Sequence, residues 1–118
     1  MPRRSSPGSG DMLQGALDML ILRSLVLGPA HGHTIAHAIA QRSEQVLQVE
    51  HGSLYPALQR LERDGLITSK WADDRRGREM KFYRLTPDGR KQLTVEESRW
   101  KKIARAMARM LQPGSVTR

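Results

Sequence analysis

Apolar residues occupy nearly every side of residues 12–27, the most apolar run in the chain. Asp11 can cap the start of a helix there, and Gly28-Pro29 would end it near Leu27. A helix that is apolar all round is buried on all sides. In so small a protein, this pattern predicts that the first helix packs against more than its own fold.

A second helix is predicted over residues 33–42, and residues 43–51 connect it to the next element. The residues that should face the core from this helix are Ile35, Ala36 and Ile39. In the connecting segment, we expect Val46 and Val49 to be tucked against the same core.

The stretch HGSLYPALQRLERDGLI, residues 51–67, predicts a third helix with leucines along one stripe. A proline is tolerated in the first turn of a helix, so Pro56 predicts a start near Ser53. Gly65 is placed to end the helix at its C′ position. The opposite side carries polar residues, namely Ser53, Gln59, Arg60 and Arg63.

After Gly65 the periodicity becomes that of strands. Residues 66–71 and 80–85 are rich in β-branched and aromatic side chains, and the charged residues 72–79 between them include a glycine. This pattern predicts a β-hairpin. The hairpin is strongly basic, with Arg75, Arg76, Arg78, Lys81 and Arg84 within ten residues.

The last helix should open at Thr86-Pro87-Asp88, which supplies an N-cap hydroxyl, a proline at the first position and an acid in the first turn. We expect it to run to Leu111 and to stop before Pro113. One side carries a narrow apolar seam of Leu93, Trp100, Ile103, Met107 and Met110. Such a seam suits pairing with a partner helix, although a terminal helix folded back on its own domain would also use it.

Three helices followed by a strand-loop-strand and a long helix predict a mostly α member of the α+β class, with the winged helix-turn-helix layout. We expect a loose tail over residues 1–10 and a DNA-binding domain over residues 11–86. A dimerisation helix over residues 87–112 and a tail over residues 113–118 complete the expected organisation.

The net charge of +8 lies entirely in the second half of the chain. Residues 1–52 hold four basic and four acidic side chains, whereas residues 53–118 hold sixteen and eight. A one-sided basic surface favours a polyanionic partner, first a nucleic acid and second an anionic membrane. Charge alone is also compatible with a surface that only keeps the protein in solution.

The remaining composition adds limits on other functions. The chain has no cysteine, so thiolate metal sites are excluded and a reducing compartment is compatible. The first ten residues lack the apolar core of a signal peptide, and residues 12–28 are too short and too polar to span a bilayer. We therefore expect a cytoplasmic protein without a membrane partner.

The start of the third helix would meet DNA, because free N–H groups and the positive end of the helix dipole attract phosphate there. Tyr55 can donate its hydroxyl to phosphate, Gln59 can pair with adenine, and Arg60 or Arg63 can pair with guanine. The alternative for this stretch alone is an ordinary amphipathic surface helix. The basic hairpin that follows directly favours DNA.

The chain resembles the PadR family of transcriptional regulators, in the short subclass with one C-terminal helix. The resemblance runs from about Leu13 to Leu111 and rests on GALDMLILRSLVLGPAHGHTIA, GSLYPALQRLERDGLI and GREMKFYRLTPDGRKQL. It implies a homodimer that binds a palindromic double-stranded DNA operator and usually represses. The family commonly has tyrosine after the glycine that opens helix two, whereas this chain has His33.

The resemblance and the residue patterns together give the expected sites. For the recognition helix they are Ser53, Tyr55, Pro56, Gln59, Arg60 and Arg63, and for the wing Arg75, Arg76, Arg78 and Lys81. His33 and Thr34 would contact the DNA backbone. The dimer interface would use Leu13, Leu17, Leu20, Leu93, Trp100, Ile103, Met107 and Met110. Two facing Trp100 rings could also bind a flat aromatic effector, unless they only fill the dimer core.

Metal binding and catalysis are not expected. His33 and His37 can share a helix face, but a zinc site would need further ligands. No nucleophile elbow or phosphate loop is present, and the acid pairs Asp73-Asp74 and Glu96-Glu97 are predicted to be simply solvated. We expect no enzyme and no cofactor. Two rival functions are a sequence-indifferent nucleic-acid binder and a module whose last helix pairs with a different protein.

Overall fold

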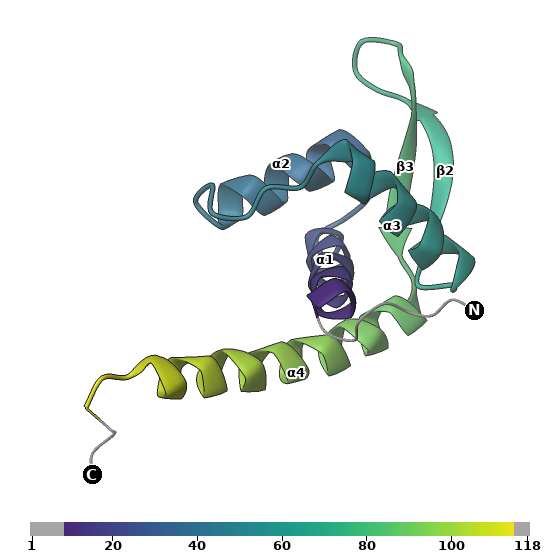
Figure 1. Ribbon diagram of the computed structural model, residues 1–118. Coiled ribbons are helices and arrows are strands. Elements are labelled where there is room, and N and C mark those ends of the chain that lie inside the picture. The colour runs from purple at the N-terminus through teal and green to yellow at the C-terminus, as the bar shows by residue number, and fades with distance from the viewer. Residues whose placement is uncertain (1–8, 115–118) are drawn as a thin grey trace.

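The computed structural model describes residues 9–114, with side chains described from Gln14 onward (Figure 1). Its elements are α1 (Ser9–Ser24), β1 (Ala30–His31), α2 (Gly32–Arg42), α3 (His51–Arg63), β2 (Ile67–Asp73), β3 (Glu79–Leu85) and α4 (Pro87–Leu111). The predicted class and order of elements are confirmed. Residues 1–8 of the tail expected over residues 1–10, residues 115–118 of the tail expected over residues 113–118, and the Leu13 side chain lie outside this description. Residues 9 and 10, also expected in the tail, belong to α1.

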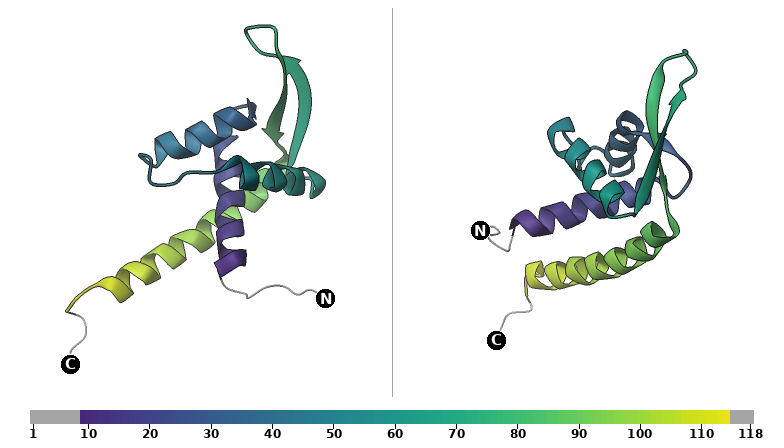
Figure 2. Two further views of the ribbon diagram at one scale, coloured as in Figure 1. Left: turned by 45° about the horizontal axis from the view of Figure 1, so that its top comes forward. Right: turned by 90° about the vertical axis from the view of Figure 1, so that its right-hand side faces the viewer.

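The core lies where α1, α2, α3, the hairpin and the first turns of α4 meet. Its buried apolar residues are Ile21, Leu22, Leu25, Ile35, Ile39, Leu54, Ala57, Leu58, Leu61, Ile67, Tyr83 and Leu93. The long helix α4 passes beneath α1, and its second half extends beyond the body (Figures 1 and 2). The core therefore fixes α3 and the hairpin on one side of the molecule, away from the free end of α4.

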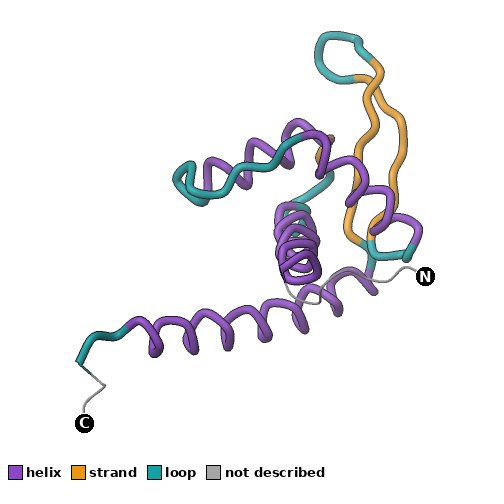
Figure 3. Tube along the Cα trace, in the orientation of Figure 1, coloured by secondary structure: helices purple, strands orange, loops and turns teal. Residues whose placement is uncertain are grey.

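The sheet has three antiparallel strands in the order β1-β3-β2 (Figure 3). The short strand β1 was not predicted, because two residues are too few to show a period. Its Ala30 pairs with Tyr83 and its His31 with Phe82. The hairpin strands are also longer than predicted, since Ala72 and Asp73 pair with Met80 and Glu79. The free loop is thus only residues 74–78.

The first helix differs from its prediction at both ends. It begins at Ser9, two residues before Asp11, and ends at Ser24 rather than Leu27. The next amides bond to carbonyls three residues back, so the chain tightens into turns that end at Gly28, where φ is +150°. Leu27 is consequently 92% exposed.

The third helix begins at His51, so the predicted start at Ser53 is wrong. The N–H groups of Ser53 and Leu54 both donate to the Glu50 carbonyl, at 3.0 and 2.9 Å. Pro56 therefore lies in the second turn and not the first. Proline has no N–H to donate to the carbonyl four residues back, that of Gly52, and its ring lies on that side of the helix.

The connection between α2 and α3 is only partly as expected. Val49 packs against the core as predicted, but Val46 is 79% exposed, so that expectation is wrong. Glu44 and Gln45 both have positive φ, 54° and 69°. This left-handed pair reverses the chain directly after α2, and the reversal leaves Val46 in solvent.

The predicted opening of α4 is confirmed. The Thr86 hydroxyl accepts from the Gly89 N–H at 2.9 Å and donates to the Gly65 carbonyl at 2.8 Å. Gly89 lies so close to the Leu66 carbonyl that a Cβ could not be placed there without a clash. The first turn of α4 is thereby joined to the base of the hairpin, and the helix ends at Leu111 as expected.

Candidate nucleic-acid interface

The outer face of α3 is available to a partner. Leu54, Ala57, Leu58 and Leu61 are buried on one side. At about 100° per residue, Pro56, Gln59 and Arg63 fall on the opposite side of the helix. All three are exposed, as are Ser53 and Tyr55 at its start. The structure therefore brings five of the six predicted recognition residues to one surface.

The sixth residue, Arg60, is an exception. Its guanidinium lies 2.5 Å from the Asp18 carboxylate of α1, and both side chains are only 24% exposed. Arg60 leaves α3 on the flank that faces α1, and the separation of 42 positions along the sequence hid this pair from sequence reasoning. Arg60 holds α3 against α1, and this ion pair argues against its predicted role in reading bases.

Burial in this ion pair disfavours the charged form of Asp18. Burial raises the pKa of Asp18 above its ordinary value, and the hydrogen bond and charge of Arg60 lower it only in part. The Nε of Arg60 is buried and has no hydrogen-bond partner among the described residues. Most of the Arg60 side chain therefore lies on the flank of α3 that faces α1.

Tyr55 belongs to α3, and its side chain packs against the start of α2. A Cβ on Gly32 would lie 2.7 Å from the Tyr55 hydroxyl and 2.9 Å from two ring carbons. The ring therefore covers Gly32, the first residue of α2, and only glycine allows this approach. Because Tyr55 remains 42% exposed, it still presents part of its surface to a partner.

A row of aromatic rings crosses the junction of α3, α2 and the sheet. The order of the rings is Tyr55, His51, His33, His31 and Phe82. The distances between the centroids of neighbouring rings are, in that order, 5.7, 6.0, 6.4 and 5.4 Å. Sequence reasoning missed His51, whose signal was its place at the first residue of α3. His33 and His51 are exposed and lie beside the recognition surface.

His31, a member of this row, bonds to Thr34 at the start of α2. The His31 Nδ1 accepts from the Thr34 N–H at 3.4 Å, which caps α2, and its Nε2 lies 3.1 Å from the Thr34 hydroxyl. Thr34 is thus engaged within the protein, whereas His33 is the freer candidate for a backbone contact. Within residues 9–114, no group of three or more His, Cys, Asp or Glu residues could hold a metal ion.

Asp74 organises the wing loop, so this carboxylate is not simply solvated as predicted. Its Oδ1 accepts from the N–H groups of Arg76 and Arg78, at 2.8 and 2.9 Å, and its Oδ2 accepts from the Arg78 Nε at 3.1 Å. These bonds, led by the Arg78 backbone N–H, lower the pKa of Asp74. Gly77 completes the loop with a φ of +79°. Glu96, also expected in solvent, is likewise largely covered, at 14% exposed.

The wing cations are not equivalent. Arg75 and Arg76 are exposed, and neither guanidinium forms an ion pair within the described part of the chain. Arg78 is paired with Asp74. Lys81 does not lie at the wing tip, since its Nζ is 3.8 Å from Glu62 of α3 and 5.8 Å from the centre of the Tyr83 ring. The tip therefore offers Arg75 and Arg76 to a partner.

A concave surface of about 400 Å³ joins α3 to the wing. Its lining includes His33, Tyr55, Gln59, Trp71 and Lys81. Trp71, which is 61% exposed, was not predicted to belong to this surface. Glu79 also lines this groove. The aromatic side chains can meet bases or sugars and Lys81 can meet a phosphate, a combination that suits a nucleic acid.

Comparison with known proteins agrees with this geometry. The family model described as "Transcriptional regulator PadR-like family" matches residues 21–95. The chain belongs to the PadR-like family of transcriptional regulators. It is 33% identical over 94 residues to the transcriptional regulator Rv3488 of Mycobacterium tuberculosis, a match that covers 78% of this chain and 82% of that protein.

Solved structures of transcriptional regulators have the same fold. A transcriptional regulator from Clostridium thermocellum matches with a TM-score of 0.76 and 25% identity, over 86% of this chain and 99% of that one. A PadR-like regulator from Bacillus cereus matches with a TM-score of 0.72 and 25% identity, over 86% and 97% of the two chains. PadR-like proteins are DNA-binding regulators and not enzymes. No helix in the described residues of this PadR-like chain is long and apolar enough to cross a membrane.

The seam of this PadR-like protein becomes steadily more exposed along α4. Leu93 is 5% exposed and packs in the core of its own protomer, which leaves little of its side chain for the predicted dimer interface. Trp100 and Ile103 are partly buried, whereas Met107 is 51% and Met110 82% exposed. On α1, Leu17 and Leu20 are partly buried against the core. The apolar surface still open to a partner lies at the free end of α4.

Proposed function

We propose that this PadR-like regulator is a homodimeric repressor of a palindromic double-stranded DNA operator. Residues 11–86 would bind DNA and residues 87–112 would join the two copies. The two α3 helices would enter successive major grooves about one helical turn, ~34–36 Å, apart. The observation that carries the proposal is that Gln59 on α3 and Arg75 and Arg76 on the wing are exposed, and no described residue forms a hydrogen bond or ion pair with their side chains.

The roles divide according to chemistry. Gln59 is placed to read a base edge, since an amide can pair bidentately with adenine. Arg63 is 72% exposed and lies 3.6 Å from Asp64, so it remains free enough to reach DNA. Arg75 and Arg76 would bind phosphates or the minor groove beside the recognition helix.

Homodimerisation is supported by the free end of α4. Met107, Met110 and Leu111 are 51%, 82% and 81% exposed. Three large apolar side chains on one projecting helix would be costly in water, and a second copy of the same helix would cover them. A single copy of α3 would also read too few base pairs for a specific operator, whereas two copies read a palindrome.

The test is selection of bound duplexes from a random library, followed by fluorescence anisotropy with the selected palindrome. We expect the palindrome to bind at least about a thousandfold more tightly than a scrambled duplex in the same salt. Transcription from a promoter that contains this palindrome should fall when the protein is added. Equal affinity for both duplexes would support the rival function, a sequence-indifferent nucleic-acid binder.

A small aromatic effector is a further part of the proposal. Trp100 is partly buried, and its Nε1 has no hydrogen-bond partner in the described chain. In a dimer, two such rings could meet and stack a flat molecule between them. In a Trp71→Phe background, where Trp100 is the remaining tryptophan, quenching by a planar dye would support this site, as would loss of dye binding in Trp100→Phe. Without quenching, Trp100 only fills the interface.

A further inference from the structure

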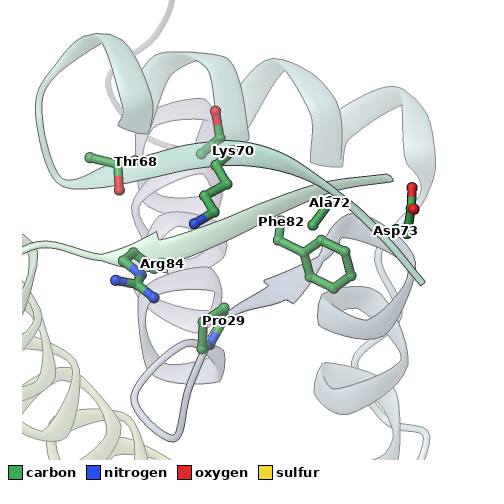
Figure 4. Close-up of a pocket in the computed structure, with 8 residues that line it drawn as sticks. Pro29, Thr68, Lys70, Ala72, Asp73, Phe82 and Arg84 are labelled. Carbon is green, nitrogen blue, oxygen red and sulfur yellow. The ribbon is translucent and has the colours of Figure 1, made fainter. Parts of the chain in front are cut away.

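The face of the sheet turned away from α3 holds a cavity of about 370 Å³ (Figure 4). Side chains alternate between the two faces of a strand, so one set of residues from β2 and β3 meets here. Those that matter are Pro29, Thr68, Lys70, Ala72, Phe82 and Arg84. The opposite face carries Ser69 and Lys81, which contact Glu62 of α3.

One part of the cavity is apolar. The Phe82 ring and Ala72 lie at one end, and Pro29 lies across from the strands (Figure 4). The Phe82 ring is held in place by an edge contact with His31, at 5.4 Å between centroids. A fixed aromatic face beside a proline ring can receive a flat apolar group.

The other part is cationic. Lys70 pairs with Phe82 across the strands, Thr68 pairs with Arg84, and all their side chains line the cavity. Lys70 and Arg84 are exposed, and neither cation has an ion pair or hydrogen bond to any residue that the structure describes. Asp73, the acid of the cavity, lies at the end away from Arg84 (Figure 4). The Thr68 hydroxyl adds a donor beside the two cations.

We propose that this cavity binds a small planar organic anion. Its ring would lie against Phe82 and Pro29, and its acidic group would lie between Lys70 and Arg84. The volume is that of a small-molecule site, which typically spans about 300–1,000 Å³ with apolar walls and few polar groups. An inorganic anion would leave the apolar part unused, and a neutral ring would leave both cations unused. The site lies on the other face of the sheet from the groove proposed to bind DNA, so it does not depend on that proposal.

The test uses 1-naphthoate and its uncharged counterpart 1-naphthalenemethanol, titrated into the full chain without DNA and followed by ¹H–¹⁵N NMR. We expect naphthoate to shift amides of residues 68–72 and 82–84 and to bind about tenfold more tightly than the alcohol. The double variant Lys70→Gln/Arg84→Gln should lose that preference. The matched variant Lys101→Gln/Arg105→Gln, on exposed positions of α4, should retain it.

Four results would overturn the proposal. Both probes could bind equally, the shifts could centre on Trp100, or the Lys70→Gln/Arg84→Gln variant could bind naphthoate like the wild type. A selected DNA duplex that displaces naphthoate from this face would assign the two cations to DNA instead. All these variants change exposed side chains, so the fold should persist and the measurement remains decisive.

Discussion

The ring of Tyr55 lies directly on Gly32, with its hydroxyl 2.7 Å from the point where a Cβ would be. This contact joins the start of α3 to the start of α2 at the surface proposed to bind DNA. A glycine at position 32 is therefore required by packing and not by an unusual backbone angle. The contact also fixes how much of Tyr55 remains for a partner.

Gly32→Ala should displace the Tyr55 ring. We expect the free energy of unfolding to fall by about 1–3 kcal/mol, as is usual for overpacking a filled site, and operator affinity to fall with it. Urea unfolding and anisotropy measure the two effects. Gly52→Ala is the control for stability, because Gly52 has nothing within 4 Å and lies in the same pair of helices. Equal unfolding curves for the two variants would contradict the packing argument.

Asp18→Asn should change how stability depends on pH. Because burial raises the pKa of Asp18 in the folded state, the folded protein binds this proton more tightly than the unfolded chain does. The stabilising contribution is then fully present below the unfolded pKa of 3.8 and is lost as pH rises through the folded pKa. The variant lacks this loss, so its stability should improve relative to wild type across that interval. Urea melts from about pH 3.5 to about pH 6 test this, and curves that stay parallel would count against it.

Asp74→Ala should loosen the wing without unfolding the protein. The Arg76 and Arg78 amides would lose their shared acceptor, so their hydrogen exchange should become faster. The neighbour Asp73→Ala is the matched control, since Asp73 makes none of these loop bonds. Because the pKa of Asp74 is lowered in the folded state, the wild-type loop bonds should persist above pH 3.8 and be lost as pH falls through the folded pKa. Unchanged exchange in Asp74→Ala would show that the loop keeps its shape without the carboxylate.

Gln59→Ala and Arg76→Ala should weaken DNA binding in different ways. Loss of a base-reading amide should cost about 1–3 kcal/mol of discrimination between operator variants. Loss of a phosphate-binding arginine should weaken all duplexes similarly and flatten the log–log salt slope by about 0.9. Anisotropy over a salt series with matched and mismatched duplexes separates the two. If both variants behaved identically, the proposed division between helix and wing would be wrong.

Met110→Glu should favour the monomer. An ionised carboxylate in the proposed α4 interface would be desolvated without a partner, which is strongly unfavourable. Light scattering over a concentration series measures the dissociation. Lys101→Glu is the control, because nine residues at about 100° each place it on the opposite side of α4. A wild-type protein that is monomeric at all concentrations would remove the dimer from the proposal.

Local signals predicted the fold well where they were strong. The Thr86-Pro87-Asp88 sequence indicated the start of α4 to the residue, and the basic hairpin appeared where alternation and a glycine placed it. The start of α3 was misplaced because the argument relied on Pro56 alone. In the structure the Ser53 and Leu54 amides both donate to the Glu50 carbonyl, and Pro56 lies in the second turn of the helix.

The candidate site was harder to predict, because tertiary partners decide which side chains are free. Arg60 looks like a DNA-reading residue on a helical wheel, but Asp18 from another helix removes it from the surface. Lys81 is similarly taken by Glu62. His51 and Trp71 join the groove only because the junction of α2, α3 and the sheet brings them there. These outcomes depend on distant pairs, which no local period encodes.

The Thr86 hydroxyl helps to set the angle at which α4 leaves the hairpin. Thr86 bonds at once to Gly65, at the foot of the sheet, and to Gly89, in the first turn of the helix. If two copies join through α4, the distance between their α3 helices depends on the geometry at Thr86. An operator with a base pair inserted at its centre would then demand that the hinge bend, and a protein with valine in place of Thr86 would tolerate such an operator better than the natural one does.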